Sequence, residues 1–132
     1  MKKSALNINL MLGMIISCGF LANVNGEELA YVSNEKDNTV SVIDVEQHKV
    51  LRKFEVGQRP RGLVLNHDGT IAYLCASDSD SIQIIDLVHE TVVGDLPSGE
   101  DPETIALHPN GKTIYTSNED DALLTVIDIA TR

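Results

Sequence analysis

The chain has 132 residues, of which 42% are hydrophobic and 4% aromatic, and its formal net charge at pH 7 is −10. A chain this acidic has no basic patch large enough to neutralise phosphates, so the composition argues against nucleic-acid binding. An anionic membrane surface would also repel it.

The first 26 residues have the order of a secretory signal peptide. Lys2 and Lys3 precede a mostly apolar stretch, and small residues close it before Gly26. Polar residues interrupt this stretch, which makes it a poor membrane span, since a span needs about 20 apolar residues. We therefore expect residues 1–26 to be removed on export to the periplasm or beyond, which leaves eight basic and twenty acidic residues and a net charge of −12.

A second processing route stays open at Cys18. The string Ile15-Ile16-Ser17-Cys18 resembles the lipobox of bacterial lipoproteins, in which the cysteine is lipidated and becomes the new N-terminus. The alternatives are thus cleavage near Gly26 and lipidation at Cys18. After cleavage near Gly26, Cys75 is the remaining cysteine, so we expect no intramolecular disulfide. The apolar neighbours of Cys75 predict a small buried residue rather than a reactive thiol.

The rest of the chain repeats every 42 residues. Tyr31, Tyr73 and Tyr115 are 42 residues apart, and the string ending in Asp44 recurs at the same interval, ending in Asp86 and Asp128. Gly57 with Gly99, Pro60 with Pro102, and Gly69 with Gly111 keep the same spacing. No insertion disturbs this register, so the repeat is a structural unit.

Within one repeat the pattern predicts four short antiparallel strands and no helix. In the second repeat these are Gly62–Leu65, Thr70–Ala76, Ser81–Asp86 and Glu90–Leu96. The turn before Thr70 contains Asp-Gly, a strong hairpin signal because glycine accepts a positive φ. In the first repeat the pattern begins at the second strand, Glu28–Ser33, and the third repeat stops in its third strand, near Thr125–Ile129.

Four such strands every 42 residues are typical of a β-propeller blade. We therefore predict an all-β, partial β-propeller over residues 27–132, with blade 1 over about 27–57, blade 2 over about 58–99 and part of blade 3 over about 100–132. This gives about 2.5 blades, whereas a closed propeller has at least about four. The sequence therefore predicts the N-terminal part of a longer protein. A β-sandwich does not predict so strict a repeat.

The repeat strings are similar to the YVTN family of bacterial β-propeller proteins. Tyr31-Val32-Ser33-Asn34 with Val42-Ile43-Asp44 carries the resemblance, and Tyr115-Thr116-Ser117-Asn118 repeats it, while Cys75-Ala76 departs from it. The string Val56-Gly57-Gln58-Arg59-Pro60-Arg61-Gly62 resembles exported propellers associated with pyrroloquinoline quinone-dependent catabolism. Those proteins accompany periplasmic quinoprotein alcohol dehydrogenases and form rings of roughly seven blades. The resemblance implies a non-catalytic periplasmic binding or accessory protein. We expect its partner to be a small molecule or a protein, such as a quinoprotein dehydrogenase or its cytochrome.

Residues suited to catalysis or to metal and cofactor binding do not converge in this sequence. The four histidines, His48, His67, His89 and His108, fall in turns and out of step with the repeat, so we expect them at the surface. There is no haem-attachment string, phosphate loop or nucleophile elbow, so we expect no cofactor in this segment. The aligned aspartates, Asp44, Asp86 and Asp128, are expected to accept backbone N–H bonds of the following turns.

Loop parity places the variable charged residues on one rim of the propeller. Loops between second and third strands, and links between blades, emerge on the same side, where Glu35 and Asp37 also lie. Positions that align in the repeat carry opposite charges here: Arg59 aligns with Asp101, and Arg61 aligns with Glu103. Varied residues on a constant frame can form a binding surface, and a solvated rim with weak ion pairs is the alternative. The candidate partner-binding residues are Arg59, Arg61, Asp78, Asp80, Glu100, Asp101, Glu103, Glu119, Asp120 and Asp121.

Two other functions stay open on the sequence. Some bacterial seven-bladed propellers that resemble these repeats are lactonases, whose catalytic residues could lie in further blades. Related repeats also occur in cell-surface proteins. Fold alone decides between none of these functions.

Overall fold

The structure, a computed structural model, describes residues 19–24 and 27–132. Its strands are β1 (Gly19–Val24), β2 (Glu27–Asn34), β3 (Thr39–Asp44), β4 (Lys49–Glu55), β5 (Pro60–Leu65), β6 (Ile71–Ala76), β7 (Ser81–Asp86), β8 (Thr91–Pro97), β9 (Pro102–Leu107), β10 (Thr113–Asn118) and β11 (Leu123–Asp128). A single 3-10 turn, η1 (Ser77–Ser79), is the one helical element of these residues. The described part of the chain contains no helix long and apolar enough to cross a membrane.

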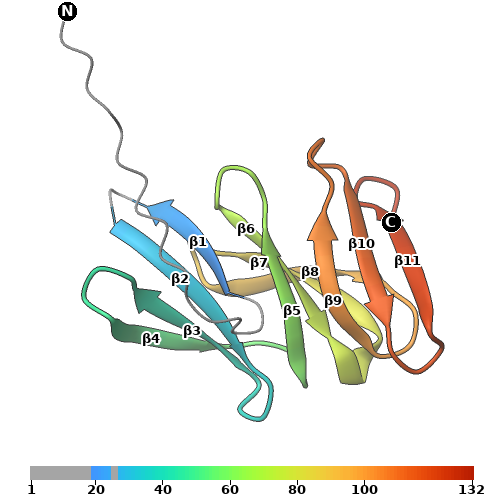
Figure 1. Cartoon of the computed structure of the whole chain (residues 1–132), viewed down its shortest axis with the longest axis horizontal. Coiled ribbons are helices and arrows are strands. Elements are labelled where there is room, and N and C mark those ends of the chain that lie inside the picture. Colours follow the sequence, from blue (N-terminus) through green and yellow to red (C-terminus); the bar gives the residue numbers. More distant parts are fainter. Residues whose placement is uncertain (1–18, 25–26) are drawn as a thin grey trace, which may run out of the picture.

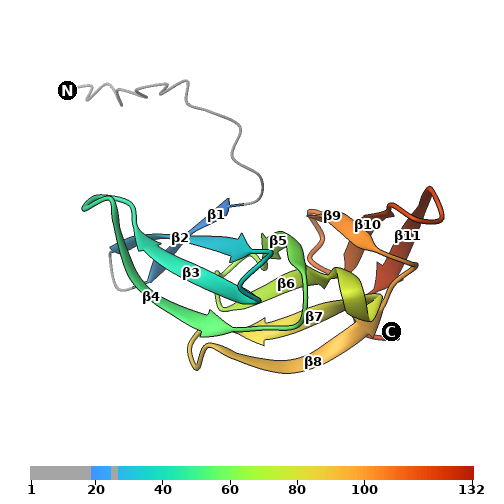
Figure 2. The same cartoon turned by 90° about the horizontal axis from the view of Figure 1, so that it is seen from below.

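The strands form three antiparallel sheets that follow one another along the chain. Blade 1 has the order β1-β2-β3-β4, blade 2 the order β5-β6-β7-β8, and blade 3 the order β9-β10-β11. Figure 1 shows the three sheets side by side from the blue to the red end of the chain, and Figure 2 shows the same succession from below. The predicted all-β, partial β-propeller is therefore confirmed.

Strand pairing repeats with the sequence. Leu29 lies opposite Asp44 in blade 1, and Ile71 opposite Asp86 in blade 2. The third strand pairs with the fourth through a bulge after Val42 in blade 1 and after Ile84 in blade 2, at the same repeat position. Because a one-residue slip would turn every side chain to the opposite face, the shared register places equivalent residues on the same face of blades 1 and 2.

The first strand of blade 1 is a difference from the sequence prediction, which gave this blade no such strand. Strand β1 lies within the predicted signal peptide and pairs with residues Glu27–Val32 of β2. Its register differs from the repeat, because Gly19 lies opposite Val32 in blade 1, whereas Leu63 lies opposite Leu74 in blade 2. By the 42-residue repeat Leu21 would face Val32. The edge of β2 thus accepts a strand two residues out of the repeat's register, since backbone pairing does not depend on side-chain identity. The alternative processing points, Cys18 and Gly26, lie outside the described residues.

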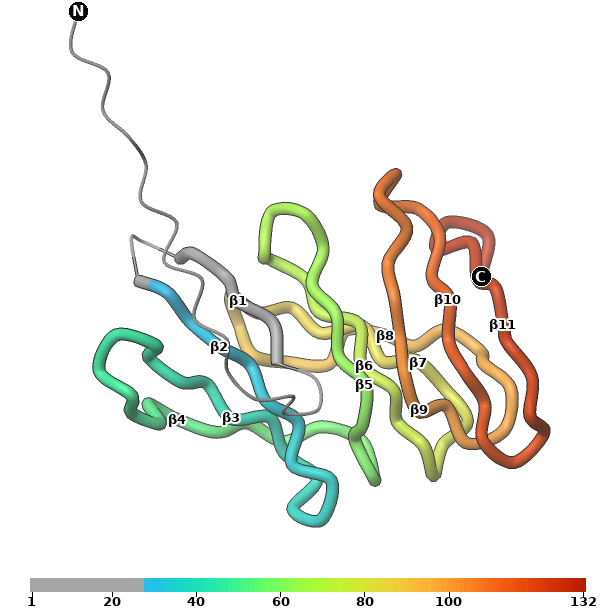
Figure 3. Tube along the Cα trace, viewed as in Figure 1, coloured from blue at the N-terminus to red at the C-terminus, as the bar shows by residue number. Residues whose placement is uncertain are grey.

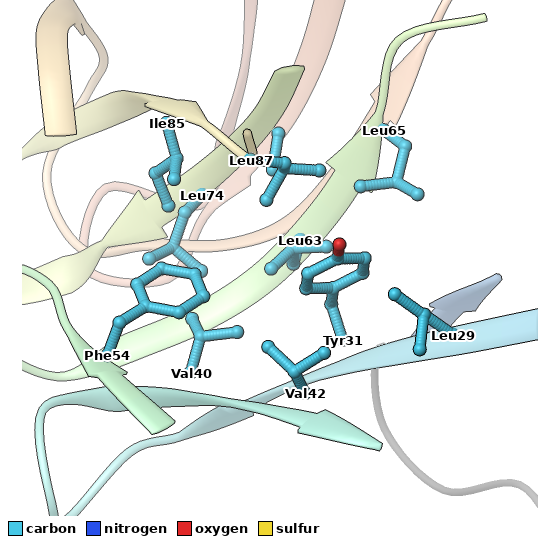
Figure 4. Packing of buried hydrophobic residues seen from close by; sticks show 11 residues of the cluster. Leu29, Tyr31, Val40, Val42, Phe54, Leu63, Leu65, Leu74, Ile85 and Leu87 are labelled. Carbon is cyan, nitrogen blue, oxygen red and sulfur yellow. The ribbon is translucent and has the colours of Figure 1, made fainter. Parts of the chain in front are cut away.

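The first core cluster fills the space between blades 1 and 2. Blade 1 contributes side chains from β2, β3 and β4, and blade 2 contributes side chains that point back from β5, β6 and β7 (Figure 4). Tyr31, Val40 and Leu74 are 1%, 0% and 0% exposed. Full burial of one such aliphatic side chain contributes about 1.5–3 kcal/mol to folding, so these contacts hold the blades together.

The second core cluster repeats this arrangement between blades 2 and 3. Tyr73, Cys75 and Ile82 of blade 2 pack against Ile114 and Ile127 of blade 3. The buried Cys75 confirms the prediction for that residue, and its sulfur lies 3.7 Å from the Thr116 hydroxyl. The Cα trace in Figure 3 shows the three blades following one another, with blade 2 between blades 1 and 3.

Strand β5 of blade 2 comes close to the backbone of β9 of blade 3 at Gly62. A Cβ atom at this position would lie 2.6 Å from the carbonyl oxygen of Glu103 and 3.0 Å from the Cα of Thr104. These are backbone atoms, which cannot move aside without separating β5 from β9.

We expect Gly62→Ala to lower the free energy of unfolding by about 1–3 kcal/mol, the usual cost of overpacking. Gly94→Ala is the matched control, because its Cβ would meet only Ile84 Cδ1 at 3.9 Å. The control should leave stability unchanged or raise it by about 0.4–1 kcal/mol. Urea unfolding followed by circular dichroism measures both, and equal losses in the two variants would contradict the close approach.

Candidate functional site

One end of the three blades carries most of the charge. We call acidic rim the residues 35–38, 56–61, 77–80, 98–103 and 119–122, which contain ten acidic and three basic side chains. The turns at the opposite end, 45–48, 66–70, 87–90 and 108–112, contain three acidic side chains and one basic. The loops and links of the acidic rim meet as the strand parity predicts. The excess negative charge is therefore concentrated on one side.

The same hydrogen bond, from a backbone N–H of a link to a side chain of the preceding loop, occurs twice in this rim. Asn38 and Asp80 end their loops in the left-handed region, at φ 56° and 48°, and Arg59 and Asp101 have φ 53° and 48° in the next link. The side chain of Asn38 accepts the N–H of Arg59 at 2.9 Å, and that of Asp80 accepts the N–H of Asp101 at 3.0 Å. Asn and Asp tolerate this conformation better than other non-glycine residues. The loop of one blade is thus fixed to the link that follows it.

Arg59 binds carboxylates from all three blades. Its guanidinium contacts Glu35 at 3.2 Å, Asp78 at 3.6 Å and Asp101 at 3.2 Å. The pKa of Arg59 is raised above its usual value, chiefly by the hydrogen bond with Glu35. The Asp101 side chain is only 9% exposed, and its Oδ1 has no hydrogen-bond partner among the described residues. The positive charge of Arg59 therefore offsets most of the free-energy cost of removing the Asp101 carboxylate from water.

Arg61 forms a second, parallel set of contacts. Its guanidinium pairs with Glu103, contacts Glu119 at 3.1 Å and lies 3.6 Å from Glu35. The pairs Arg59–Asp101 and Arg61–Glu103 join aligned repeat positions, so the charge exchange seen in the sequence brings opposite charges together in space. A hollow of about 250 Å³ lies here, lined by Ser33, Glu35, Pro60, Arg61, Gly62, Glu103 and Thr104.

The remaining candidate residues do not join the arginine contacts. Glu100, Asp120 and Asp121 are exposed, and the Asp121 carboxylate accepts the N–H of Leu123 at 3.3 Å. The Asp80 side chain accepts the backbone N–H of Asp101. Five carboxylates thus surround two guanidinium groups, while the outer carboxylates face water. The rim keeps a net negative charge after its internal pairs are counted.

Two hydroxyls that no sequence pattern indicated connect neighbouring blades. Ser33 donates to the carbonyl of Arg61 at 2.6 Å, and Ser77 donates to the carbonyl of Pro102 at 2.7 Å. They occupy different repeat positions, so the 42-residue periodicity gave no signal for them. The repeat also gives no signal for the close backbone approach at Gly62, because the equivalent position in the next repeat is not a glycine but Thr104.

The aligned aspartates are turn caps, as predicted. Asp44 accepts the N–H of Gln47 at 2.8 Å, Asp86 those of Val88 and His89 at 2.8 and 3.1 Å, and Asp128 those of Ala130 and Thr131, both at 3.0 Å. The pKa of Asp86 is lowered, first by the side-chain hydrogen bond with His89 and then by the backbone bonds. The pKa of Asp128 is lowered mainly by the N–H of Thr131. These contacts assign the repeated acid to the fold.

All four histidines are exposed, as predicted. The ring of His67 lies 2.8 Å from the carbonyl of Pro109, the equivalent residue of the next blade. The ring of His108 lies 6.2 Å from that of Tyr115. Over residues 19–24 and 27–132, no group of three or more histidine, cysteine or acidic side chains is arranged to hold a metal ion.

Comparisons with known proteins show the fold. No family model matches the sequence, and no curated protein matches it. Among solved structures, the chain is similar to Kuenenia stuttgartiensis hydrazine synthase, with a TM-score of 0.73 and 22% identity, over 96% of this chain and 37% of that one. It is also similar to a functionally unknown protein from Desulfotomaculum acetoxidans, with a TM-score of 0.61 and 20% identity, over 81% of this chain and 39% of that one.

A third similar structure is the dihydro-heme d1 dehydrogenase NirN in complex with DHE, with a TM-score of 0.61 and 21% identity, over 76% of this chain and 22% of that one. At these identities the likeness concerns the fold alone. The chain spans less than two fifths of each of the three structures. The protein is thus a β-propeller protein, and the described residues form two four-stranded blades and three strands of a third.

Replacement of Arg59 tests its role at the rim. We expect Arg59→Met to lower the melting temperature, because the buried carboxylate of Asp101 loses its partner. The double variant R59M/D101N should recover most of the loss, since no unpaired charge remains. Lys53→Met is the control: its ion pair with Asp37 joins side chains that are 49% and 62% exposed, and such pairs contribute little. Equal losses in R59M and K53M would contradict this role.

The lowered pKa of Asp86 predicts a pH dependence. The ionised carboxylate stabilises the fold above the pKa of the unfolded chain, and this stabilisation is lost as the pH falls through the lower pKa of the folded state. Asp86→Ala should therefore melt below the wild type at pH 7, and the difference should shrink below about pH 4. Asp86→Asn keeps an acceptor oxygen and should lose less. Thermal melts from pH 2.5 to 7 measure this, and a gap that does not vary with pH would refute the cap.

Proposed function

We propose that this protein is a non-catalytic, exported β-propeller protein that binds a partner through its acidic rim. The supporting observation is the charge distribution, with ten acidic and three basic side chains on one rim. The two arginines are already paired with carboxylates of the same chain. The surface left for a partner is negative, so the partner surface should be basic.

The size of the hollow beside Arg61 favours a protein partner over a small molecule. Its volume of about 250 Å³ is below the ~300–1,000 Å³ that is usual for small-molecule sites. Protein partners instead contact several loops at once, and the rim presents three loops and two links. Loops on a rigid scaffold are where propellers and other repeat proteins carry binding residues.

The sequence resemblance supplies the biological setting of the proposal. It points to the periplasm and to quinoprotein-dependent alcohol oxidation, with a quinoprotein dehydrogenase or its cytochrome as the partner. The signal-peptide pattern over residues 1–26 is consistent with that compartment.

The test uses exposed rim acids that stand outside the arginine contacts. D120K/D121K should weaken co-purification with the quinoprotein dehydrogenase or its cytochrome and slow association at least about tenfold at low ionic strength. Glu46→Lys is the matched control on the opposite rim, where Glu46 is exposed. Exchange of Arg59 and Arg61 for glutamate is a poorer test of binding. It would replace the two positive charges by negative ones among the five carboxylates that the arginines neutralise, so it would also destabilise the contacts between blades.

Binding should also weaken as salt rises, because exposed charges are screened. Unchanged binding in D120K/D121K would refute the rim as the partner surface. Hydrolysis of lactones by the purified protein would overturn the non-catalytic function and support an enzyme.

A further inference from the structure

The turn between β9 and β10 contains the dipeptide Asn110-Gly111, a pair that is open to attack on its own side chain. The backbone nitrogen of a glycine can reach the amide of the preceding asparagine, because glycine has no side chain to hinder the approach. Asn110 is exposed, so water reaches it. The turn lies at the same end of the molecule as the β5–β6 turn (Figure 1). The sequence has one other Asn-Gly pair, at 25–26, which lies outside the described residues.

The hydrogen bonds of this turn act on both reacting groups. The Oδ1 atom of Asn110 accepts the N–H of Lys112 at 2.9 Å. A donor at this oxygen stabilises the negative charge that develops on it when a nucleophile attacks the amide carbon. The N–H of Gly111 donates to the carbonyl of His108 at 2.8 Å. This second bond must open before the nitrogen of Gly111 can attack, so the reaction depends on local opening of the turn.

A histidine of the neighbouring blade restrains the same turn. The Nε2 atom of His67 lies 2.8 Å from the carbonyl oxygen of Pro109. The Cδ2 atom of the same ring lies 3.3 Å from the place that a Cβ atom on Gly111 would take. The ring of His67 therefore lies beside the residues on both sides of Asn110 and opposes opening of the turn.

Blade 2 shows the turn that an aspartate forms at this repeat position. Asp68 is the repeat equivalent of Asn110, and the glycines that follow these two residues have φ of 73° and 71°. The Oδ1 atom of Asp68 accepts the N–H of Thr70 at 3.1 Å, which corresponds to the bond between Asn110 and the N–H of Lys112. An aspartate at position 110 is therefore compatible with the backbone of the turn.

We propose that Asn110 is a site of spontaneous deamidation and that His67 slows the reaction. The backbone nitrogen of Gly111 attacks Cγ of Asn110 and forms an N–C bond, its proton passes to the amide nitrogen, and ammonia leaves. Water, the one co-reactant, then opens the succinimide ring. Cleavage of the new N–Cγ bond gives aspartate, whereas cleavage at the backbone carbonyl carbon gives isoaspartate. No atom is oxidised or reduced.

The two products differ in their effect on the contact between blades 2 and 3. Aspartate keeps the length of the backbone, so the bond between His67 and Pro109 is retained. Isoaspartate runs the chain through the side chain and adds a carbon atom to the backbone of the turn. The turn then loses its present geometry, and the contact with His67 weakens. Either product adds a negative charge at this position.

Peptide mapping of the whole folded chain by mass spectrometry, after incubation at neutral and at mildly alkaline pH, tests the proposal. Fragmentation should locate the mass increase of an amide-to-acid exchange at Asn110, with a faster rate at the higher pH, because the attacking nitrogen must lose its proton. Asn66 is the internal control: its Oδ1 also accepts backbone N–H groups, both at 3.0 Å, but His67 follows it instead of a glycine. Asn110→Asp should show no increase at this position and should melt as the wild type does.

Variants of His67 test its restraint on the turn. His67→Ala should speed the reaction at Asn110 about threefold or more, since loss of a hydrogen bond lowers the free energy needed to open the turn. His67→Gln keeps a donor and should react at a rate closer to that of the wild type. Glu46→Ala is the control, because Glu46 is exposed in the turn between β3 and β4 of blade 1. Far-UV circular dichroism checks that all three variants are folded.

The outcomes separate the two parts of the proposal. If Asn110 kept its amide in the folded chain while it reacted in urea, or if Asn66 reacted as fast, the deamidation site would be overturned. If His67→Ala reacted no faster than Glu46→Ala, the restraint by His67 would be overturned.

Discussion

The burial of apolar side chains between consecutive blades is the interaction on which the rest of the structure depends. A single four-stranded blade has two apolar faces, and neither is covered by the blade itself. Blade 2 is the one described blade with a neighbour on each side, and its Leu74 and Ile82, on opposite faces, are both 0% exposed. The equivalent residues of the outer faces, Val32 in blade 1 and Leu124 in blade 3, are less buried because no neighbouring blade covers them among the described residues.

The acidic rim is a consequence of this packing. Once the blades are in contact, loops separated by about one repeat meet at one end, and Arg59 and Arg61 come within reach of carboxylates from three blades. Surface ion pairs are individually weak, but Asp101 is nearly buried and depends on Arg59. The arginines therefore stabilise the frame, whereas the outer acids Asp120 and Asp121 are exposed and take no part in the arginine contacts. These outer acids are the residues that we propose for partner binding.

Strand β1 illustrates how an open sheet edge is completed. The edge of β2 offers unpaired backbone groups, and any extended segment of suitable length can pair with it. Here residues 19–24 do so, with Gly19 rather than Leu21 opposite Val32. In the sequence these residues have the composition of a secretory leader, because they belong to a mostly apolar segment that follows two lysines. The backbone pairing in the structure depends on an available edge, which no sequence pattern of the segment reveals.

The sequence by itself determined the blade, because the 42-residue repeat, the alternation of apolar residues and the Asp-Gly turn are local signals that specify strands and turns. It also determined the turn caps at Asp44, Asp86 and Asp128, whose partners lie within three residues. Only the tertiary structure decided which charges pair, how Gly62 admits the neighbouring backbone, and which face of blade 3 packs against blade 2. These features depend on distances between residues some 40 positions apart in the sequence, and such distances are fixed only when the blades pack.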